Sequence, residues 1–249
     1  MVSTVKICGL ATAATLEAAL DAGADMVGLV FFAKSPRFVG LDHAHELAVR
    51  ARDRAKIVAL TVDAEDDLLA AIVRVVGPDM LQLHGRETPQ RVAAIKQAFG
   101  LPAMKAIGVA EAADFARARD YEAVADWLLI DAKPPKDAVL PGGNGRPFDW
   151  RLARDFAPKV PWLLSGGLDP DNVSQAIALS GARGVDVSSG VERAPGVKDE
   201  KKIAAFVVAA RAALARAPSP LAGRWPRSGR MRGRRRQASL ATDGEIDRR

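Results

Sequence analysis

Two side chains that can exchange protons each stand at the end of a short β-like run. Cys8, the only cysteine of the chain, ends the run Val5–Cys8, and Asp131 ends an apolar run that begins at Trp127. A thiol and a carboxyl that face one substrate from two sides can act as general base and general acid. Alone, each has an ordinary alternative, because free cysteine often packs as a small hydrophobe and aspartate often caps helices or loops. Together they indicate an acid–base site.

A cysteine that acts as a base needs a stabilised thiolate, because its reference pKa is about 8.5. Lys6 lies two positions before Cys8, so both side chains share one face of a strand, roughly 7 Å apart. We therefore predict that the ammonium group of Lys6 favours the thiolate.

Glycine and serine residues follow two late apolar runs and predict a phosphate site. Gly166 and Gly167 follow the first of these runs, and Ser188, Ser189 and Gly190 follow the second. Glycine lets backbone N–H groups approach an anion, and a short helix starting at the serines would add the positive end of its dipole. Either segment alone is a weak signal, but the tandem is stronger, since the loops after strands seven and eight of α/β barrels often hold phosphate.

Arg37, in the segment Ser35–Arg37, could bind a second anionic group. Its planar guanidinium suits a carboxylate, whereas an ordinary surface arginine is the alternative on spacing alone.

Eight short apolar runs predict the strands that must position these groups. They are Thr4–Cys8, Met26–Phe31, Lys56–Val62, Met80–Leu83, Ala103–Ile107, Trp127–Ile130, Pro161–Leu164 and Gly184–Val187. Amphipathic stretches lie between them, such as Glu65–Val76, and Thr88 and Asp169 each precede a proline as helix caps do. The alternation predicts a single α/β domain, a (β/α)8 TIM barrel over residues 1–215. An open doubly wound sheet is the alternative, but no G-x-G-x-x-G motif follows the first run.

Residues two apart on a strand share a face, so the strand ends predict where polar groups gather. The pairs on one face are Lys6 with Cys8, Gln82 with His84, Leu129 with Asp131, and Asp186 with Ser188. The apolar residues between them, Ile7, Leu83 and Val187, suit packing against outer helices. Polar groups are thus expected at one rim of the barrel.

The basic charge is concentrated at the C-terminal end. Residues 216–249 hold ten arginines and three acidic residues, a net charge of +7 against +6 for the whole chain, so residues 1–215 are near neutral. Helical periodicity stops there, and proline and glycine interrupt the stretch, which predicts a disordered tail. We expect a solvated appendage and no nucleic-acid partner; contact with nucleic acid or an acidic partner is the alternative.

The remaining composition sets further expectations. A single cysteine cannot form an internal disulfide, and neither a signal peptide nor a membrane-spanning run is evident, so a cytoplasmic protein is expected. Three scattered histidines and one cysteine offer no metal-ligand spacing.

Several segments in order resemble the phosphoribosylanthranilate isomerases of tryptophan biosynthesis, from about Val5 to Phe206. They are Lys6–Gly9, Ser35–Arg37, Gln82–Gly85, Gly142–Gly145 with Phe148–Trp150, Gly166–Leu168 with Pro170 and Asn172–Val173, and Asp186–Glu192 with Pro195–Gly196. Ser165 stands where alanine is expected and Asn144 where threonine or serine is commoner, and residues 216–249 have no counterpart in the family.

The resemblance implies an Amadori rearrangement of N-(5′-phosphoribosyl)anthranilate without cofactor or metal. It implies Asp131 as the acid that protonates the ring oxygen and Cys8 as the base that removes the C2′ proton. The substrate contacts that it implies are Gly166, Gly167, Ser188, Ser189 and Gly190 for the phosphate, Arg37 for the anthranilate carboxylate, Asp186 for a ribose hydroxyl, and His84 either as a positioning group or as a rim histidine.

Two alternative functions remain open at this point. The chain could be another phosphate-binding barrel, such as a sugar-phosphate isomerase or epimerase, or a non-catalytic barrel whose tail binds a partner. The stretch Pro134–Pro147 could be a lid or a plain flexible connection. A monomer or a homodimer is expected.

Overall fold

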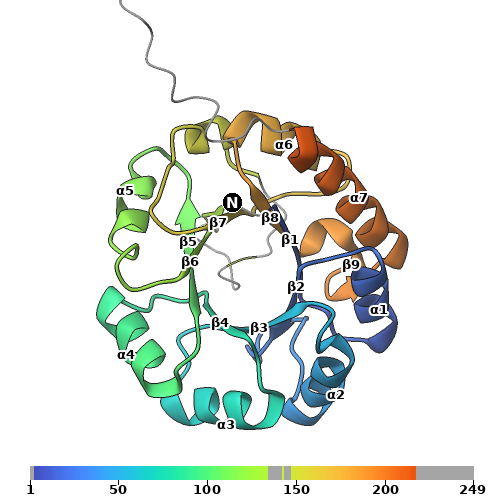
Figure 1. The fold of residues 1–249 in the computed structure, drawn as a ribbon, viewed down its shortest axis with the longest axis vertical. Helices are drawn as coiled ribbons and strands as arrows, with labels where there is room; N and C mark the ends of the chain where they lie inside the picture. The colour runs from blue at the N-terminus through green and yellow to red at the C-terminus, as the bar shows by residue number, and fades with distance from the viewer. Residues whose placement is uncertain (1–2, 134–141, 143–146, 217–249) are drawn as a thin grey trace, which may run out of the picture. The chain divides into compact units, whose positions relative to one another are not determined.

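The chain forms a closed barrel of eight parallel strands surrounded by helices, as the alternating sequence pattern predicts (Figure 1). The computed structural model describes residues 3–133, 142 and 147–216. Neighbouring strands pair in chain order, and β1 pairs with β8 to close the ring. The strands are β1 Thr4–Cys8, β2 Met26–Val30, β3 Lys56–Thr61, β4 Met80–Leu83, β5 Ala103–Val109, β6 Trp127–Ala132, β7 Trp162–Leu164 and β8 Gly184–Val187. The prediction of a (β/α)8 barrel is therefore confirmed.

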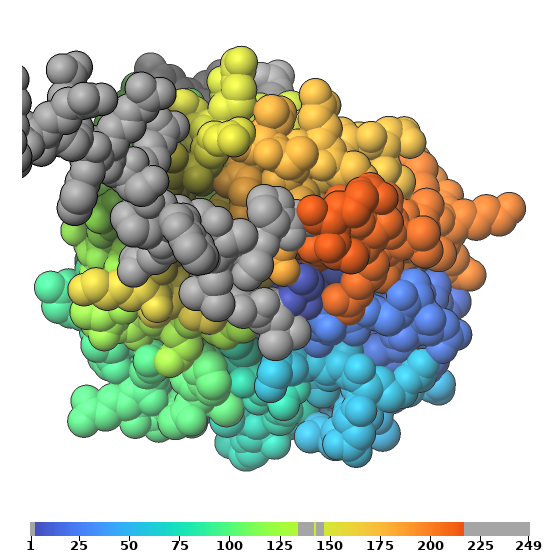
Figure 2. Space-filling view, turned by 45° about the horizontal axis from the view of Figure 1, so that its top comes forward, coloured from blue at the N-terminus to red at the C-terminus, as the bar shows by residue number. Residues whose placement is uncertain are grey.

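Seven α-helices of the described residues lie around the barrel. They are α1 Ala13–Asp21, α2 Leu41–Ala51, α3 Asp66–Val76, α4 Pro89–Phe99, α5 Asp114–Arg119, α6 Val173–Ser180 and α7 Glu200–Arg216. Short 3-10 helices, η1 Trp150–Ala153 and η2 Ser189–Val191, follow β6 and β8, and β9 Glu192–Ala194 pairs with β10 Val197–Lys198. Figure 2 shows α7, in orange-red, beside α1, in blue, so the last described helix packs next to the first.

The structure differs from the sequence pattern in detail at two helices. A helix after every strand was expected, and the described part of the β6–β7 connection contains η1, a 3-10 helix that the Asp149 side chain caps. Asp169 accepts the N–H groups of Asp171 and Asn172, as a cap does, but it caps a turn, and α6 begins only at Val173.

Two apolar regions on opposite sides of the strands fix the site at one rim. Ile7, Leu83 and Val187 belong to the large core between the strands and the helices, as predicted. Inside the barrel, Met26, Met80 and Met104 belong to a second buried cluster. Because these side chains fill the amino-terminal part of the barrel interior, polar groups are confined to its carboxyl-terminal part.

Two predictions about the chain ends and loops lie outside the described residues. The proposed disordered tail covers residues 216–249, of which only Arg216, the last residue of α7, is described. The possible lid over 134–147 is described only at Gly142 and Pro147. Among the described residues, no helix is long and apolar enough to cross a membrane.

The N-cap of α4 gives a test of the local rules that place this helix. The Thr88 side chain accepts the backbone N–H of Arg91 at 3.2 Å, and Pro89 occupies the first turn. Thr88→Ala should lower the free energy of unfolding by about 1 kcal/mol in urea denaturation, because one backbone donor loses its partner. Thr88→Ser keeps the hydroxyl and should stay near wild type; equal losses in both variants would contradict the capping role.

Candidate active site

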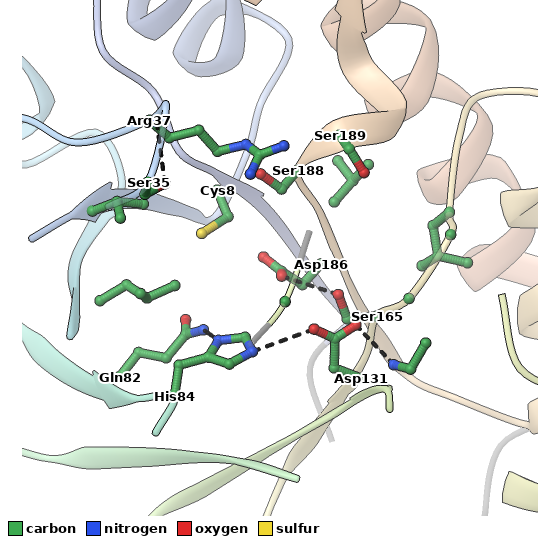
Figure 3. A pocket seen from close by; sticks show the side chains of 18 of the residues that line it. Cys8, Ser35, Arg37, Gln82, His84, Asp131, Ser165, Asp186, Ser188 and Ser189 are labelled. Carbon is green, nitrogen blue, oxygen red and sulfur yellow. Dashed lines mark hydrogen bonds and ion pairs between the residues drawn. The ribbon is translucent and has the colours of Figure 1, made fainter. Parts of the chain in front are cut away.

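One pocket opens at the carboxyl-terminal ends of the strands and gathers most of the predicted site residues (Figure 3). The predicted residues that line it are Cys8, Arg37, His84, Asp131, Gly166, Gly167, Asp186, Ser188 and Ser189. Gly190 is the exception. Gln82, Ser165 and Leu60 also contribute to the wall. The space, including its opening to solvent, is about 820 Å³.

Cys8 ends β1 with its side chain inside the barrel and only 3% of the residue exposed. Gly28 lies directly across from it on β2. A Cβ atom at position 28 would stand 2.8 Å from Cys8 Sγ, so glycine there makes room for the thiol. Val30 and Leu60 pack beside the sulfur.

The Lys6–Asp186 ion pair lies beneath the thiol. Lys6 Nζ donates to Asp186 Oδ1 at 2.7 Å, and both side chains are almost completely buried. The hydroxyl of Ser165 donates to the other carboxylate oxygen at 3.3 Å. Burial lowers the pKa of Lys6, but attraction to Asp186 and Cys8 outweighs it and leaves that pKa raised, so the ammonium group stays charged.

The predicted stabilisation of the thiolate by Lys6 is outweighed by burial. Burial raises the pKa of Cys8, the charges of Lys6 and Lys198 lower it, and the carboxylate of Asp186 raises it again. The net pKa lies above the ordinary thiol value. Because burial outweighs the attraction of the two lysines, and Asp186 offsets part of the field of Lys6, the protein without ligand holds Cys8 as a thiol at neutral pH.

Asp131 and His84 face each other across the pocket. His84 Nε2 lies 3.3 Å from Asp131 Oδ2, and Asp131 Oδ1 accepts the backbone N–H of Ala132 at 2.8 Å. Gln82, two positions before His84 on the same side of β4, places its Nε2 3.0 Å from His84 Nδ1. The carboxyl group is thus held from both sides.

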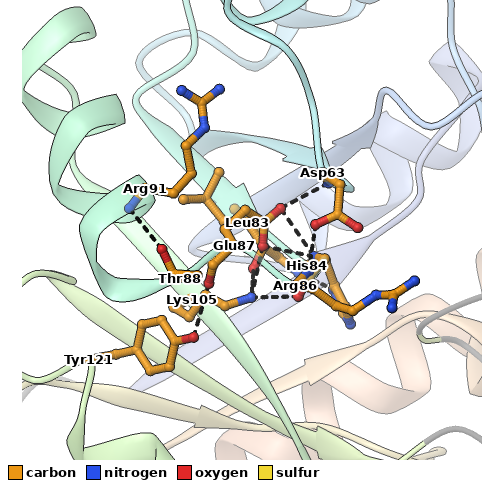
Figure 4. A network of polar contacts seen from close by, with 11 residues as sticks. Asp63, Leu83, His84, Arg86, Glu87, Thr88, Arg91, Lys105 and Tyr121 are labelled. Carbon is orange, nitrogen blue, oxygen red and sulfur yellow. Dashed lines mark hydrogen bonds and ion pairs between the residues drawn. The ribbon is translucent and has the colours of Figure 1, made fainter.

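The loop that carries His84 is fixed by a buried polar network (Figure 4). Lys105 Nζ donates to the carbonyls of Leu83 and Gly85 and to Glu87 Oε2, at 3.1, 2.8 and 2.8 Å. Glu87 also accepts the backbone N–H groups of Asp63 and Gly85. One lysine therefore binds the backbone on both sides of His84, which limits how far the imidazole can move.

The two glycine–serine loops pack directly on each other. Gly166 and Gly167 have φ values of 86° and 66°, in the left-handed region that favours glycine. A Cβ atom on Gly190 would overlap the backbone carbonyl of Leu168, so Gly190 lets the loops approach but does not line the pocket. The predicted short helix at the serines is confirmed as η2.

Arg37 lies at the pocket wall, where it also forms a buried ion pair that the sequence pattern did not predict. Its Nε and Nη2 atoms donate to the two carboxylate oxygens of Glu192 at 2.7 and 3.0 Å. Lys198 Nζ donates to Glu192 at 2.8 Å and to the carbonyl of Ser188 at 2.9 Å. Two cations thus share one carboxylate, which leaves a local excess of positive charge where anions are expected to bind.

The structure adds Glu192 and Lys198 to the predicted residues around the pocket, and it places Gln82 in the pocket wall, on the same side as His84, as the alternation rule predicts. Glu192 falls within a motif that the sequence does display. Lys198 has no such signal, since it lies in a short hairpin that brings it back beneath Ser188. Among the described residues, no group of three or more His, Cys, Asp or Glu could hold a metal ion.

The fold and pocket define a (β/α)8-barrel protein with acid, base and anion-binding groups gathered at the carboxyl-terminal rim. The family described as N-(5′-phosphoribosyl)anthranilate (PRA) isomerase matches residues 5–209. An N-(5′-phosphoribosyl)anthranilate isomerase of Rhodopseudomonas palustris (strain BisB5) is 61% identical over 208 residues, which cover 84% of this chain and 95% of that protein. The chain therefore belongs to the phosphoribosylanthranilate isomerase family, a family of enzymes.

Solved structures of the same family share the fold. The phosphoribosylanthranilate isomerase of Thermotoga maritima is 33% identical, with a TM-score of 0.76 over 85% of this chain and all of that one. A second crystal structure, also 33% identical, has a TM-score of 0.72 over the same shares of both chains. It holds reduced 1-(o-carboxyphenylamino)-1-deoxyribulose 5-phosphate.

The buried thiol can be tested directly, because Cys8 is the only cysteine. Titration of the native protein, followed by the ultraviolet absorbance of the thiolate, should give a pKa above that of the same chain unfolded in urea, since burial disfavours the charged form. The unfolded chain is its own control. A native pKa below the unfolded value would show that Lys6 and Lys198 dominate after all.

Proposed function

We propose that this protein catalyses the Amadori rearrangement of N-(5′-phosphoribosyl)anthranilate to 1-(2-carboxyphenylamino)-1-deoxyribulose 5-phosphate in tryptophan biosynthesis. The observation that carries the proposal is the meeting of Cys8 and Asp131 in one pocket with two glycine-rich loops. A sugar that is held by its phosphate end would present its ring between the thiol and the carboxyl group.

Asp131 supplies the proton that opens the sugar ring. Transfer of its proton to the ring oxygen breaks the C1′–O bond and forms an iminium between C1′ and the anthranilate nitrogen. The contacts from His84 and from the N–H of Ala132 support this role, because they hold the carboxyl group in one orientation.

Cys8 removes the proton from C2′ once the iminium has made that proton acidic. The electron pair of the C2′–H bond forms an enolamine. Its tautomerisation adds a proton at C1′ and releases the proton of the C2′ hydroxyl, which gives the ketone. The raised pKa of Cys8 makes its thiolate a stronger base but a scarcer one at neutral pH. The substrate gains one proton from Asp131 and loses another to Cys8, so substrate and product have the same composition.

The two ends of the substrate are anionic, and the pocket offers a separate set of hydrogen-bond donors for each. The backbone of Gly166, Gly167, Ser188 and Ser189 receives the phosphate, and Arg37 receives the anthranilate carboxylate. Glu192 orients the guanidinium of Arg37 for this contact. Asp186 lies at the pocket floor, where it can accept a ribose hydroxyl. Binding both ends fixes the ribose between acid and base, which can remove several kcal/mol of the barrier.

A cytoplasmic location and a monomeric or homodimeric state stay predictions. So do the disordered tail over residues 216–249 and the absence of a nucleic-acid partner.

The acid and base roles are tested by Cys8→Ser and Asp131→Asn. Each change should lower kcat at least roughly a hundredfold with little change in KM, because a proton-transfer group is lost while the binding groups stay. The assay follows anthranilate fluorescence after addition of freshly prepared phosphoribosylanthranilate. Thr4→Val, at the far end of β1 from Cys8, is the matched control and should keep wild-type turnover. Normal turnover in either test variant would remove that residue from the mechanism.

The role of Arg37 is tested with a pair of ligands. The wild-type protein should bind the reduced product roughly tenfold to a hundredfold more tightly than the same compound with hydrogen in place of its carboxylate, because a charge-assisted hydrogen bond is lost. In Arg37→Met the two ligands should have nearly equal Kd values, measured by calorimetry. Thermal denaturation checks folding, since Glu192 loses one of its two cationic partners. An undiminished preference in the variant would assign the carboxylate to another group.

A further inference from the structure

We propose that Gln82 is a positioning and substrate-binding residue of this pocket, and the proposal rests on the acid role assigned above to Asp131. Its amide nitrogen fixes the proton of His84 on Nε2, facing Asp131. Its amide oxygen accepts a hydroxyl or N–H donor of the bound sugar phosphate.

The amide nitrogen of Gln82 determines the tautomer of His84. Gln82 Nε2 lies 3.0 Å from His84 Nδ1, and an amide N–H can only donate, so Nδ1 must accept. The single ring proton of the neutral imidazole is then on Nε2, which lies 3.3 Å from Asp131 Oδ2. Figure 3 shows the three side chains joined in this order along one wall of the pocket. Gln82 therefore decides which atom of His84 faces the acid.

The amide oxygen of Gln82 is the atom that we assign to the ligand. Gln82 is completely buried and lines the pocket, yet among the described residues its Oε1 has no hydrogen-bond partner. In Figure 3 this oxygen points away from the His84 ring. A buried acceptor without a partner is unfavourable, and a ligand that donates to it relieves that cost on binding. The proposed substrate carries such donors in its ribose hydroxyls and its amine.

The surroundings prevent the pair from rearranging. Leu83, between Gln82 and His84, is anchored in the outer core, and Lys105 binds the carbonyls of Leu83 and Gly85. The backbone of this strand end is therefore fixed. A change at position 82 should then act through the side chain.

The tautomer is tested by 15N NMR of the full-length protein without ligand. The chain has three histidines, and loss of one set of ring signals in His84→Asn identifies His84. In the wild type its Nδ1 should have the shift of an unprotonated ring nitrogen. In Gln82→Glu it should become protonated, because imidazole is a stronger base than the carboxylate placed beside it. Thr61→Val, which removes another completely buried side-chain oxygen without a described partner on the neighbouring strand β3, should leave the signals unchanged.

A protonated Nδ1 in the wild type would place the amide oxygen, not the nitrogen, on the ring and overturn the proposal. An unprotonated Nδ1 in Gln82→Glu would do the same. The wild-type reading needs only His84→Asn, for signal assignment, so it decides the tautomer even if Gln82→Glu fails to fold. It also needs no turnover, so a chain that lacked isomerase activity would refute the proposed function and still report the tautomer.

The ligand contact is tested with reduced 1-(o-carboxyphenylamino)-1-deoxyribulose 5-phosphate as the probe. Gln82→Met is similar in size and removes both polar atoms, so it should raise the Kd of the probe about tenfold and lower kcat as well. Thr61→Val should change neither value. An unchanged Kd in a folded Gln82→Met protein would overturn the substrate-binding half of the proposal.

Discussion

The ion pair between Lys6 and Asp186 is the interaction on which the rest of the site depends. The two residues are register partners on β1 and β8, the strands whose pairing closes the barrel. Their charged atoms meet at 2.7 Å with almost no exposure to solvent. Removing one partner of such a pair costs about 3–5 kcal/mol, because the other charge stays buried and unpaired. The pairing of β1 with β8 that closes the barrel therefore also places Cys8 close to β8.

Buried charges hold each functional side chain from a neighbouring element. Lys105 and Glu87 hold the loop behind His84, and Glu192 holds the guanidinium of Arg37 while Lys198 holds the carbonyl of Ser188. Because these groups are buried, their contacts are stronger than they would be on the surface. They also restrict motion, which suits a reaction that depends on the position of a proton donor and a proton acceptor.

The surroundings of Cys8 affect its proposed role as a base in two opposite ways. Burial raises the pKa of Cys8, and the lysines beneath it only partly offset that effect. A base with a raised pKa accepts a proton more readily but is less often ionised at neutral pH. The apolar side chains Val30 and Leu60 beside the sulfur exclude water, so the state of Cys8 depends on the few charges that surround it.

The sequence by itself determined the eight strands and the end of the barrel at which the polar side chains gather. All eight predicted strands exist, their ends differ from the predicted ones by at most two residues, and the alternation of side chains correctly placed Cys8 and His84 inside and Ile7 and Leu83 outside. These features follow from backbone geometry over a few residues, which any strand shares. That is why local pattern was sufficient for most of the fold.

Only the tertiary structure decided which polar groups meet. Asp186 is 180 positions from Lys6, and Glu192 is 155 positions from Arg37, so nothing local in the sequence pairs them. The start of α6 and the burial that outweighs the effect of Lys6 on the pKa of Cys8 were likewise fixed by packing. The physical reason is that desolvation and charge pairing depend on every neighbour in space, and those neighbours are brought together only when the barrel closes.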